Sequence, residues 1–287
     1  MNPQLTTESL RRDPLPLRGR TALVTGASRR AGIGHAVARR LAAYGASVYL
    51  HHHVRHDAGQ PWGADPEGPE GVADSVRAVL GDPDARVFHG PGDLSDPDAP
   101  AALLATAAET LGGRVDILVA NHALSGSDGA LDAINADMLD AHWAIDARSV
   151  ILLVQAYARL RAGFSDSDDG RTGVPGGRIM MMTSGQDLGA GMPYEIAYSL
   201  AKGALASATR SLATTLADLA VTVNTVNPGP VDTGYLEGAE YEQVAAMFPA
   251  GRWGLPDDPA RLIAWLATDE AAWITGQVID SEGGFRR

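Results

Sequence analysis

Residues 21–34 read TALVTGASRRAGIG, and this stretch decides the fold. Residues 21–25 form a short apolar run rich in β-forming residues, and a helical spacing of apolar residues begins at Ile33. The glycines at this turn are Gly26, Gly32 and Gly34, and their spacing is two residues longer than in the usual short form of a dinucleotide-binding loop. Glycines at such a turn let the backbone approach a pyrophosphate, and the helix N-terminus offers free N–H groups. The stretch therefore predicts a strand–turn–helix unit that binds a dinucleotide.

The same alternation continues along the chain. Six further apolar stretches rich in β-forming residues cover 47–50, 85–90, 115–121, 177–184, 221–229 and 276–284. Helical patterns lie near 70–80, 98–111, 137–162 and 198–220. Apolar strands that alternate with helices are typical of a parallel sheet covered on both faces. We therefore expect a single α/β domain built on a doubly wound, seven-stranded parallel sheet.

The domain is expected to span residues 19–287, after a flexible lead-in at 1–18. Residues 55–70 and 164–177 are rich in Pro, Gly and acidic residues, which predicts surface insertions. Residues 230–255 are irregular and follow the sixth strand, so they are expected to form a substrate lid.

Composition excludes several classes of protein. The 287 residues carry a formal net charge of −12, which argues against nucleic acid as a partner. The absence of cysteine excludes disulfides, thiolate nucleophiles and cysteine-ligated metals. No apolar run is long enough to span a membrane, and the N-terminus lacks the apolar core of a signal peptide, so a cytoplasmic protein is expected.

Lys202 is the single lysine of the chain, and Tyr198 lies four residues before it. On a helix this spacing places both side chains on one face. A nearby ammonium favours the phenolate and is expected to lower the pKa of Tyr198 from about 10. Ser184, at the end of the fifth strand, is the preferred hydroxyl for stabilising a developing alkoxide, because Thr183 should point the other way.

Together these elements resemble the short-chain dehydrogenase/reductase family over roughly residues 18–285. The shared motifs are the glycine loop, Asn121-His122-Ala123-Leu124, Ser184, the Tyr198/Lys202 pair and Pro228-Gly229. The overall sequence looks most similar to the 3-oxoacyl-[acyl-carrier-protein] reductase branch. The resemblance implies a Rossmann fold, a nicotinamide cofactor and a homo-oligomer, either a dimer or a tetramer.

Further roles are carried over from the family. The resemblance places Asp93 at the adenine, the backbone at position 124 near the cofactor ribose, and the Val231 backbone and Thr233 hydroxyl near the nicotinamide. Two positions depart from the pattern, since Leu124 replaces a glycine and Asp146 replaces an asparagine whose backbone carbonyl holds a water leading to the lysine. Asp146 is kept as a catalytic candidate of open role. The expected cofactor-binding set is Gly26, Ser28, Arg29, Arg30, Gly32, Ile33, Gly34, His52, Arg55, Asp93, Leu94, Asn121, Ala123, Tyr198, Lys202, Pro228, Gly229, Val231 and Thr233.

The choice of cofactor depends on the end of the second strand. NAD sites usually carry an acidic residue there, but this chain reads His51-His52-His53. Arg29, Arg30 and Arg55 lie nearby, and arginine suits a 2′-phosphate, so NADPH is favoured over NADH. Neighbouring strand residues point to opposite faces, so the three histidines predict no metal site.

These expectations combine into an NADPH-dependent carbonyl reductase acting on a 3-oxoacyl or other ketone substrate. Tyr198 would donate the proton, Ser184 would bind the carbonyl oxygen, and Lys202 would tune Tyr198 and bind the ribose. The alternatives are an NAD-dependent alcohol dehydrogenase using the same residues, or a non-enzymatic relative that binds the cofactor. Substrate contacts are expected from 186–196 and 233–253, with Met192, Tyr194, Tyr235, Met247, Phe248 and Trp253.

Overall fold

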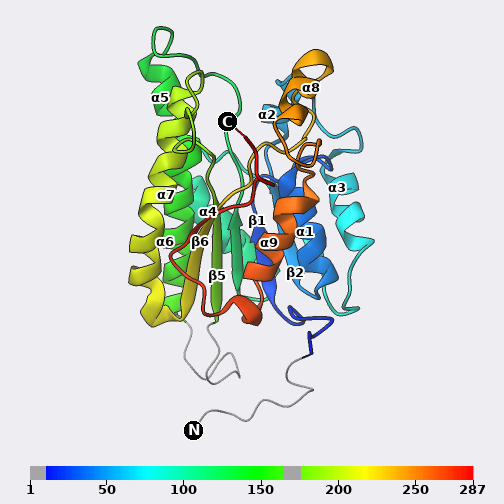
Figure 1. The fold of residues 1–287 in the computed structure, drawn as a ribbon. Coiled ribbons are helices and arrows are strands. Elements are labelled where there is room, and N and C mark those ends of the chain that lie inside the picture. The colour runs from blue at the N-terminus through cyan, green and yellow to red at the C-terminus, as the bar shows by residue number, and fades with distance from the viewer. Residues whose placement is uncertain (1–10, 164–175, 287) are drawn as a thin grey trace.

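The computed structural model describes residues 11–163 and 176–286, which form one seven-stranded parallel sheet with helices on both faces (Figure 1). The strands are β1 (Thr21–Val24), β2 (Ser47–His52), β3 (Val87–Pro91), β4 (Ile117–Ala120), β5 (Gly177–Met182), β6 (Val221–Asn227) and β7 (Val278–Asp280). Their order in the sheet is β3-β2-β1-β4-β5-β6-β7, and every pairing is parallel. The predicted doubly wound fold is confirmed.

Nine α-helices lie in the described part of the chain. They are α1 (Ile33–Ala43), α2 (Val54–Ala58), α3 (Gly68–Arg77), α4 (Ala99–Thr110), α5 (Ala136–His142), α6 (Ser149–Ala162), α7 (Ile196–Leu216), α8 (Gly238–Ala246) and α9 (Asp257–Leu266). A π-helical segment, η1 (Trp143–Arg148), joins α5 to α6. None of these helices combines the length and apolar composition that crossing a bilayer requires.

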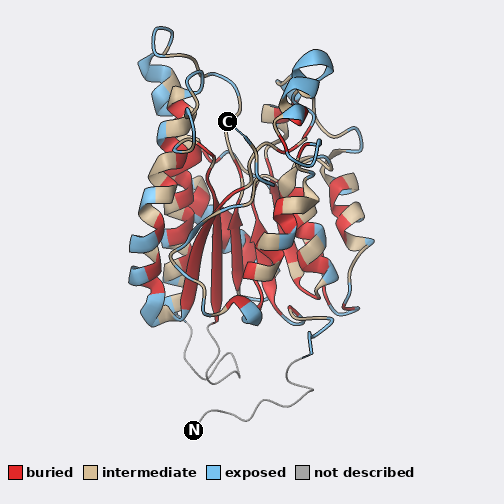
Figure 2. Cartoon of the chain, viewed as in Figure 1, coloured by how far each residue is buried: buried red, intermediate tan, exposed pale blue. Residues whose placement is uncertain are grey.

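Two hydrophobic layers flank the sheet because successive strand residues face opposite sides. Along β1, Ala22 and Val24 pack with α1, α3 and α9, whereas Leu23 packs with α4, α6 and α7. All three side chains are fully buried, and Figure 2 shows the sheet buried along its length. The near-continuous apolar runs of the sequence are therefore explained by burial on both faces.

The strand order reverses between β1 and β4. The chain winds outward from β1 to β2 and β3, then crosses back to β4 and continues to β7. In open parallel sheets the loops that follow two such strands diverge, and the crevice between them binds ligands. The glycine loop after β1 and residues 121–128 after β4 therefore face each other at this point.

Two expected boundaries differ from the structure. Residues 55–70 are not only a loop, because α2 and the first turn of α3 fall within them. Leu17 is 1% exposed and its N–H donates to the Tyr44 carbonyl, so the packed domain begins before residue 19. Residues 1–10 of the expected lead-in and 164–175 of the second insertion lie outside the described residues.

Glycine is required at position 26 by a close backbone contact. Gly26 has a φ of 69°, and a Cβ placed there would lie 2.7 Å from the His122 Cα. The Asn121 side-chain amide donates to the carbonyl oxygens of Thr25 and Gly26 at 3.0 and 3.1 Å. The end of β4 thus holds the glycine loop against it.

We expect Gly26→Ala to destabilise the protein more than Gly19→Ala. Both glycines have positive φ, so each alanine costs about 1–2 kcal/mol in the free energy of unfolding. A Cβ at Gly19 has nothing within 4 Å, whereas one at Gly26 meets backbone that cannot rotate away. Urea unfolding of the two variants measures the difference, and equal losses would show that the contact with residue 122 does not constrain the loop.

Candidate active site

A cavity of about 1240 Å³ opens at the crevice between the two halves of the sheet. One end is formed by the glycine loop and the segment that follows β2. The other end is formed by Ser184, which follows β5, and by Tyr198 and Lys202 in the N-terminal part of α7. The cavity therefore brings the predicted dinucleotide loop and the predicted reacting groups into one continuous space.

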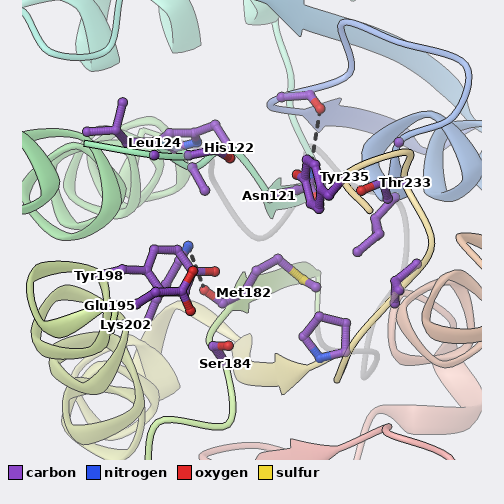
Figure 3. A pocket seen from close by; sticks show the side chains of 18 of the residues that line it. Asn121, His122, Leu124, Met182, Ser184, Glu195, Tyr198, Lys202, Thr233 and Tyr235 are labelled. Atoms are coloured by element: carbon purple, nitrogen blue, oxygen red, sulfur yellow. Dashed lines mark hydrogen bonds between the residues drawn. The ribbon is translucent and has the colours of Figure 1, made fainter. Parts of the chain in front are cut away.

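Tyr198 and Lys202 project from one face of α7 into this cavity, as their spacing predicts (Figure 3). Lys202 is 1% exposed, and its Nζ donates to the Met182 carbonyl oxygen at 3.2 Å. The same nitrogen lies 5.5 Å from the centre of the Tyr198 ring. The ammonium is thus fixed between the end of β5 and the phenol.

Burial raises the pKa of Tyr198 well above its ordinary value, and the charge of Asp146 acts in the same direction. The hydrogen bond between the Tyr198 and Ser184 hydroxyls opposes this shift. Burial also lowers the pKa of Lys202, while Asp146 acts to raise it. The expectation that Lys202 holds the pKa of Tyr198 below its usual range is therefore wrong for this structure, because desolvation dominates.

The two hydroxyl residues at the end of β5 have different partners. The Thr183 hydroxyl donates to the Lys202 carbonyl oxygen at 2.9 Å and is buried. The Ser184 side chain points into the cavity beside Tyr198 (Figure 3) and lies 3.6 Å from the Met192 sulfur. Ser184 is therefore the hydroxyl that a ligand in the cavity can reach.

Acidic residues from 55–70 hold two of the arginines near the glycine loop. Arg29 Nε lies 3.1 Å from Asp57 Oδ1, and its guanidinium lies over the Trp62 ring. Arg30 binds Asp65 and Glu67, at 2.9 and 2.6 Å, and does not line the cavity. The positive charge expected at this end of the site is thus largely compensated.

Arg55 differs from these two arginines. It is exposed at the start of α2 and lines the cavity. Among residues 11–163 and 176–286, no carboxylate lies within 4 Å of its guanidinium. Arg55 is therefore the cation at this end of the cavity that remains available to an anionic ligand.

The three histidines after β2 face different groups. His51 lies between the Gly26 N–H and the Gly92 carbonyl, His52 contacts His89 away from the cavity, and His53 reaches Gly92. Burial lowers the pKa of both His51 and His52 to about 4. The neutral rings of His51 and His52 therefore act as hydrogen-bonding groups. In the described ranges, no three His, Asp or Glu side chains gather as metal ligands do.

The segment after β4 connects the site to Asp146. His122 is buried between the Thr25 and Ser149 hydroxyls, at 2.7 Å from each. The Leu124 N–H donates to Asp146 Oδ1 at 2.7 Å, so the leucine in place of the family glycine is held by a carboxylate. Asp146 itself is fully buried in η1 and does not line the cavity.

Residues of the segment 230–255, the expected lid, line the cavity and contact the segment 55–70. The Tyr235 ring packs against Trp62 with centroids 4.5 Å apart, and Arg29 Nη1 donates to the Thr233 carbonyl at 3.2 Å. The lid contains α8 and contributes Met247 and Trp253 to the cavity wall. Phe248 instead packs in the interior against Trp253 and Phe285.

Most of the predicted site residues line this one cavity. Those that the structure does not place on its wall are Arg30, Gly34, His52, Asp146 and Phe248. Gly34 packs behind the cavity wall and leaves room for it, because a Cβ there would lie 2.7 Å from both Asn121 Nδ2 and the Gly26 carbonyl oxygen.

Sequence reasoning missed several residues of the wall. Among them are Asp57, Trp62, Asp128, His142 and Phe285. The i, i+4 spacing of His142 and Asp146 was a usable signal for one of them. Asp57 lies in the short helix α2, Trp62 and Asp128 lie in loops, and Phe285 lies near the C-terminal end, where no periodicity marks them.

Comparisons with known proteins identify the family of this chain. A family model described as "Enoyl-(Acyl carrier protein) reductase" matches residues 26–286. The chain is 41% identical over 266 residues to "Uncharacterized oxidoreductase YjdA" of Bacillus subtilis, covering 93% of this chain and 96% of that one.

Two solved structures have the same fold. A Serratia marcescens short-chain dehydrogenase/reductase variant matches with a TM-score of 0.78 and 31% identity, covering 95% of this chain and all of that one. A blue fluorescent protein from a metagenomic library, in complex with NADPH, matches with a TM-score of 0.78 and 28% identity over the same shares. The chain belongs to the short-chain dehydrogenase/reductase family and is an oxidoreductase, as the sequence motifs predicted.

We expect the buried neutral histidines, His51 and His122, to make the protein less stable in acid. Burial holds the pKa of His122 well below 6.5, so the unfolded chain binds more protons as the pH falls below about 6.5. The stability that the neutral rings contribute is fully present above that pH and is lost progressively below it. His122→Gln, which keeps polar atoms for Thr25 and Ser149, should lose less stability than wild type between pH 7.5 and 5, by about 2 kcal/mol. Urea unfolding at both pH values measures this, and parallel losses would contradict it.

Proposed function

We propose that this protein is an NADPH-dependent carbonyl reductase in which Tyr198 donates the proton. The observation that carries the proposal is the cluster of Tyr198, Ser184 and Lys202 at the closed end of the cavity that begins at the glycine loop. A hydroxyl, a phenol and an ammonium gathered at one place in a cavity can bind and protonate the oxygen of a carbonyl group.

The residues present fit a dinucleotide. Gly26 and Gly32 line the cavity without a side chain, so the backbone of the glycine loop is open to a ligand there. The Thr233 hydroxyl is buried in the cavity wall and has no hydrogen-bond partner among the described residues. When bound, the nicotinamide supplies the hydride. The family resemblance puts Lys202 at the ribose and the Val231 backbone and Thr233 at the carboxamide.

The charge state of Tyr198 supports reduction. The phenol keeps its proton at neutral pH, which is the form that a proton donor needs, and its raised pKa makes release of that proton depend on the charges around it. Ser184 can donate a hydrogen bond to the carbonyl oxygen as negative charge develops there. Lys202, held by the Met182 carbonyl, provides a fixed positive charge beside the phenol after its proton has left.

The preference for NADPH now depends on fewer arginines than the sequence suggested. Arg30 lies outside the cavity and Arg29 is paired with Asp57, which leaves Arg55 as the principal candidate for a 2′-phosphate. The NADPH complex of the metagenomic blue fluorescent protein supports the same choice by similarity.

The cavity wall near Tyr198 favours a moderately hydrophobic carbonyl substrate. Apolar and aromatic side chains dominate it, namely Met192, Tyr194, Tyr235, Met247 and Trp253. A 3-oxoacyl or other ketone substrate fits this surface. The family resemblance further supports a homo-oligomer.

Tyr198→Phe should abolish turnover and leave cofactor binding intact. Removing the proton donor lowers kcat by about 10²- to 10⁴-fold, while the ring still fills its place on α7. NADPH consumption with acetoacetyl-coenzyme A and with phenylpropanedione measures turnover, and quenching of protein fluorescence measures binding. If the wild type binds cofactor but reduces neither probe, the non-enzymatic alternative is favoured instead.

Arg55→Ala should weaken NADPH binding by about tenfold and leave NADH binding unchanged, because a lost contact to a 2′-phosphate affects only one cofactor. Arg30→Ala is the matched control, since Arg30 is engaged by Asp65 and Glu67 outside the cavity. Titration of both cofactors against wild type and the two variants tests this. Equal effects of Arg55→Ala on the two cofactors, or tighter binding of NADH by wild type, would contradict the assignment of NADPH.

A further inference from the structure

A buried His–Asp pair lies beside Tyr198, and the proposed function does not use it. His142 ends α5 and Asp146 follows four residues later in η1, so the two side chains share one face. His142 Nδ1 is 2.7 Å from Asp146 Oδ2, and neither side chain is more than 1% exposed. A carboxylate this deeply buried is stable only with such a partner.

The partners of His142 require a protonated ring. Nδ1 faces the Asp146 carboxylate, and Nε2 lies 3.1 Å from the Gly126 carbonyl oxygen. Asp128 Oδ2 is 3.9 Å from the same Nε2. A neutral imidazole has one N–H and cannot donate to acceptors on both sides, whereas an imidazolium can. Burial lowers the pKa of His142, but the hydrogen bond and charge of Asp146 outweigh it and raise the pKa above its ordinary value.

The pair faces the proposed proton donor. The His142 ring packs edge-on against the Tyr198 ring, with centroids 6.0 Å apart. The charge of Asp146 acts on both groups of the α7 pair, since it raises the pKa of Tyr198 and of Lys202. The ionisable groups that face His142 and Asp146 from the surrounding elements are His56 of α2, Asp128 after β4, Glu195 before α7, and Tyr198 and Lys202 within α7.

We propose that His142 is a positioning residue whose positive charge compensates Asp146, so that Tyr198 can release its proton to the substrate. The inference rests on the proposed function, in which Tyr198 is the donor. As the proton moves from the Tyr198 oxygen to the carbonyl oxygen, negative charge develops on the phenol. An uncompensated carboxylate nearby opposes that charge, and protonated His142 cancels the opposition.

The sign of the pH dependence follows from this arrangement. Below the pKa of His142 the pair is neutral overall and reduction proceeds at its full rate. Above that pKa the ring loses its charge, Asp146 is left uncompensated, and reduction slows. The loss should be about tenfold, which corresponds to about 1.4 kcal/mol in the activation free energy.

Three variants test the proposal through reduction of acetoacetyl-coenzyme A or phenylpropanedione. His142→Gln keeps a donor for Asp146 but removes the charge, so kcat should fall about tenfold and lose this limb of the pH profile. Asp146→Asn keeps an acceptor for the Leu124 N–H and removes the carboxylate. The double variant His142→Gln/Asp146→Asn should therefore recover most of the activity lost in His142→Gln. A double variant as impaired as the worse single variant overturns the proposal, because a purely structural role predicts that result.

A second measurement needs no substrate. Proton NMR of ¹³C-histidine-labelled protein follows the titration of each ring, and His142→Gln identifies the signal of residue 142. That signal should titrate above the ordinary value of histidine in wild type and lower in Asp146→Asn. Titration at or below the ordinary value in wild type overturns the charged pair, whatever the activity. A wild type that reduces no probe although His142 titrates high instead contradicts the proposed function, and with it the role of His142 in proton transfer.

Discussion

The close approach of the Gly26 backbone to residues 121 and 122 is the constraint on which the rest of the site depends. It occurs where the strand order reverses, so it joins the two halves of the sheet at the edge where their loops diverge. The Asn121 amide fixes the contact by donating to two carbonyl oxygens of the glycine loop. Because this contact is fixed, the loop after β1 and the residues after β4 form two walls of one cavity. Tyr198 and Lys202 of α7 line its other end.

The parts of the molecule that could be predicted from the sequence are those that local periodicity or helix geometry determines. The apolar strands gave the parallel sheet, and the four-residue spacing gave the shared face of Tyr198 and Lys202. The environment of Arg29 and Arg30 could not be predicted this way, because their acidic partners come from a segment whose position depends on tertiary packing. The pKa of Tyr198 was misjudged for the same reason, since it depends on how completely the fold removes water from the phenol.

Histidines around the cavity take opposite charge states. His51 and His122 are surrounded by backbone and hydroxyl groups, so burial keeps them neutral. His142 is equally enclosed, but the Asp146 carboxylate, four residues further along the chain, stabilises the positive charge that burial alone would remove. The π-helical turn matters here because it contains Asp146, whose other oxygen accepts from the chain after β4. Asp146 therefore binds both the Leu124 N–H in the cavity wall and the charged His142 ring beside Tyr198.

The single lysine has a consequence for the chemistry of the whole protein. Every other basic side chain is an arginine, and Lys202 is 1% exposed, with its nitrogen hydrogen-bonded inside the cavity. The outer surface therefore presents no side-chain amine to acylating or cross-linking reagents. An amine-directed reagent that labels a side chain of the folded protein must first enter the cavity. Covalent labelling at this one nitrogen thus reports directly on whether the cavity is open or filled.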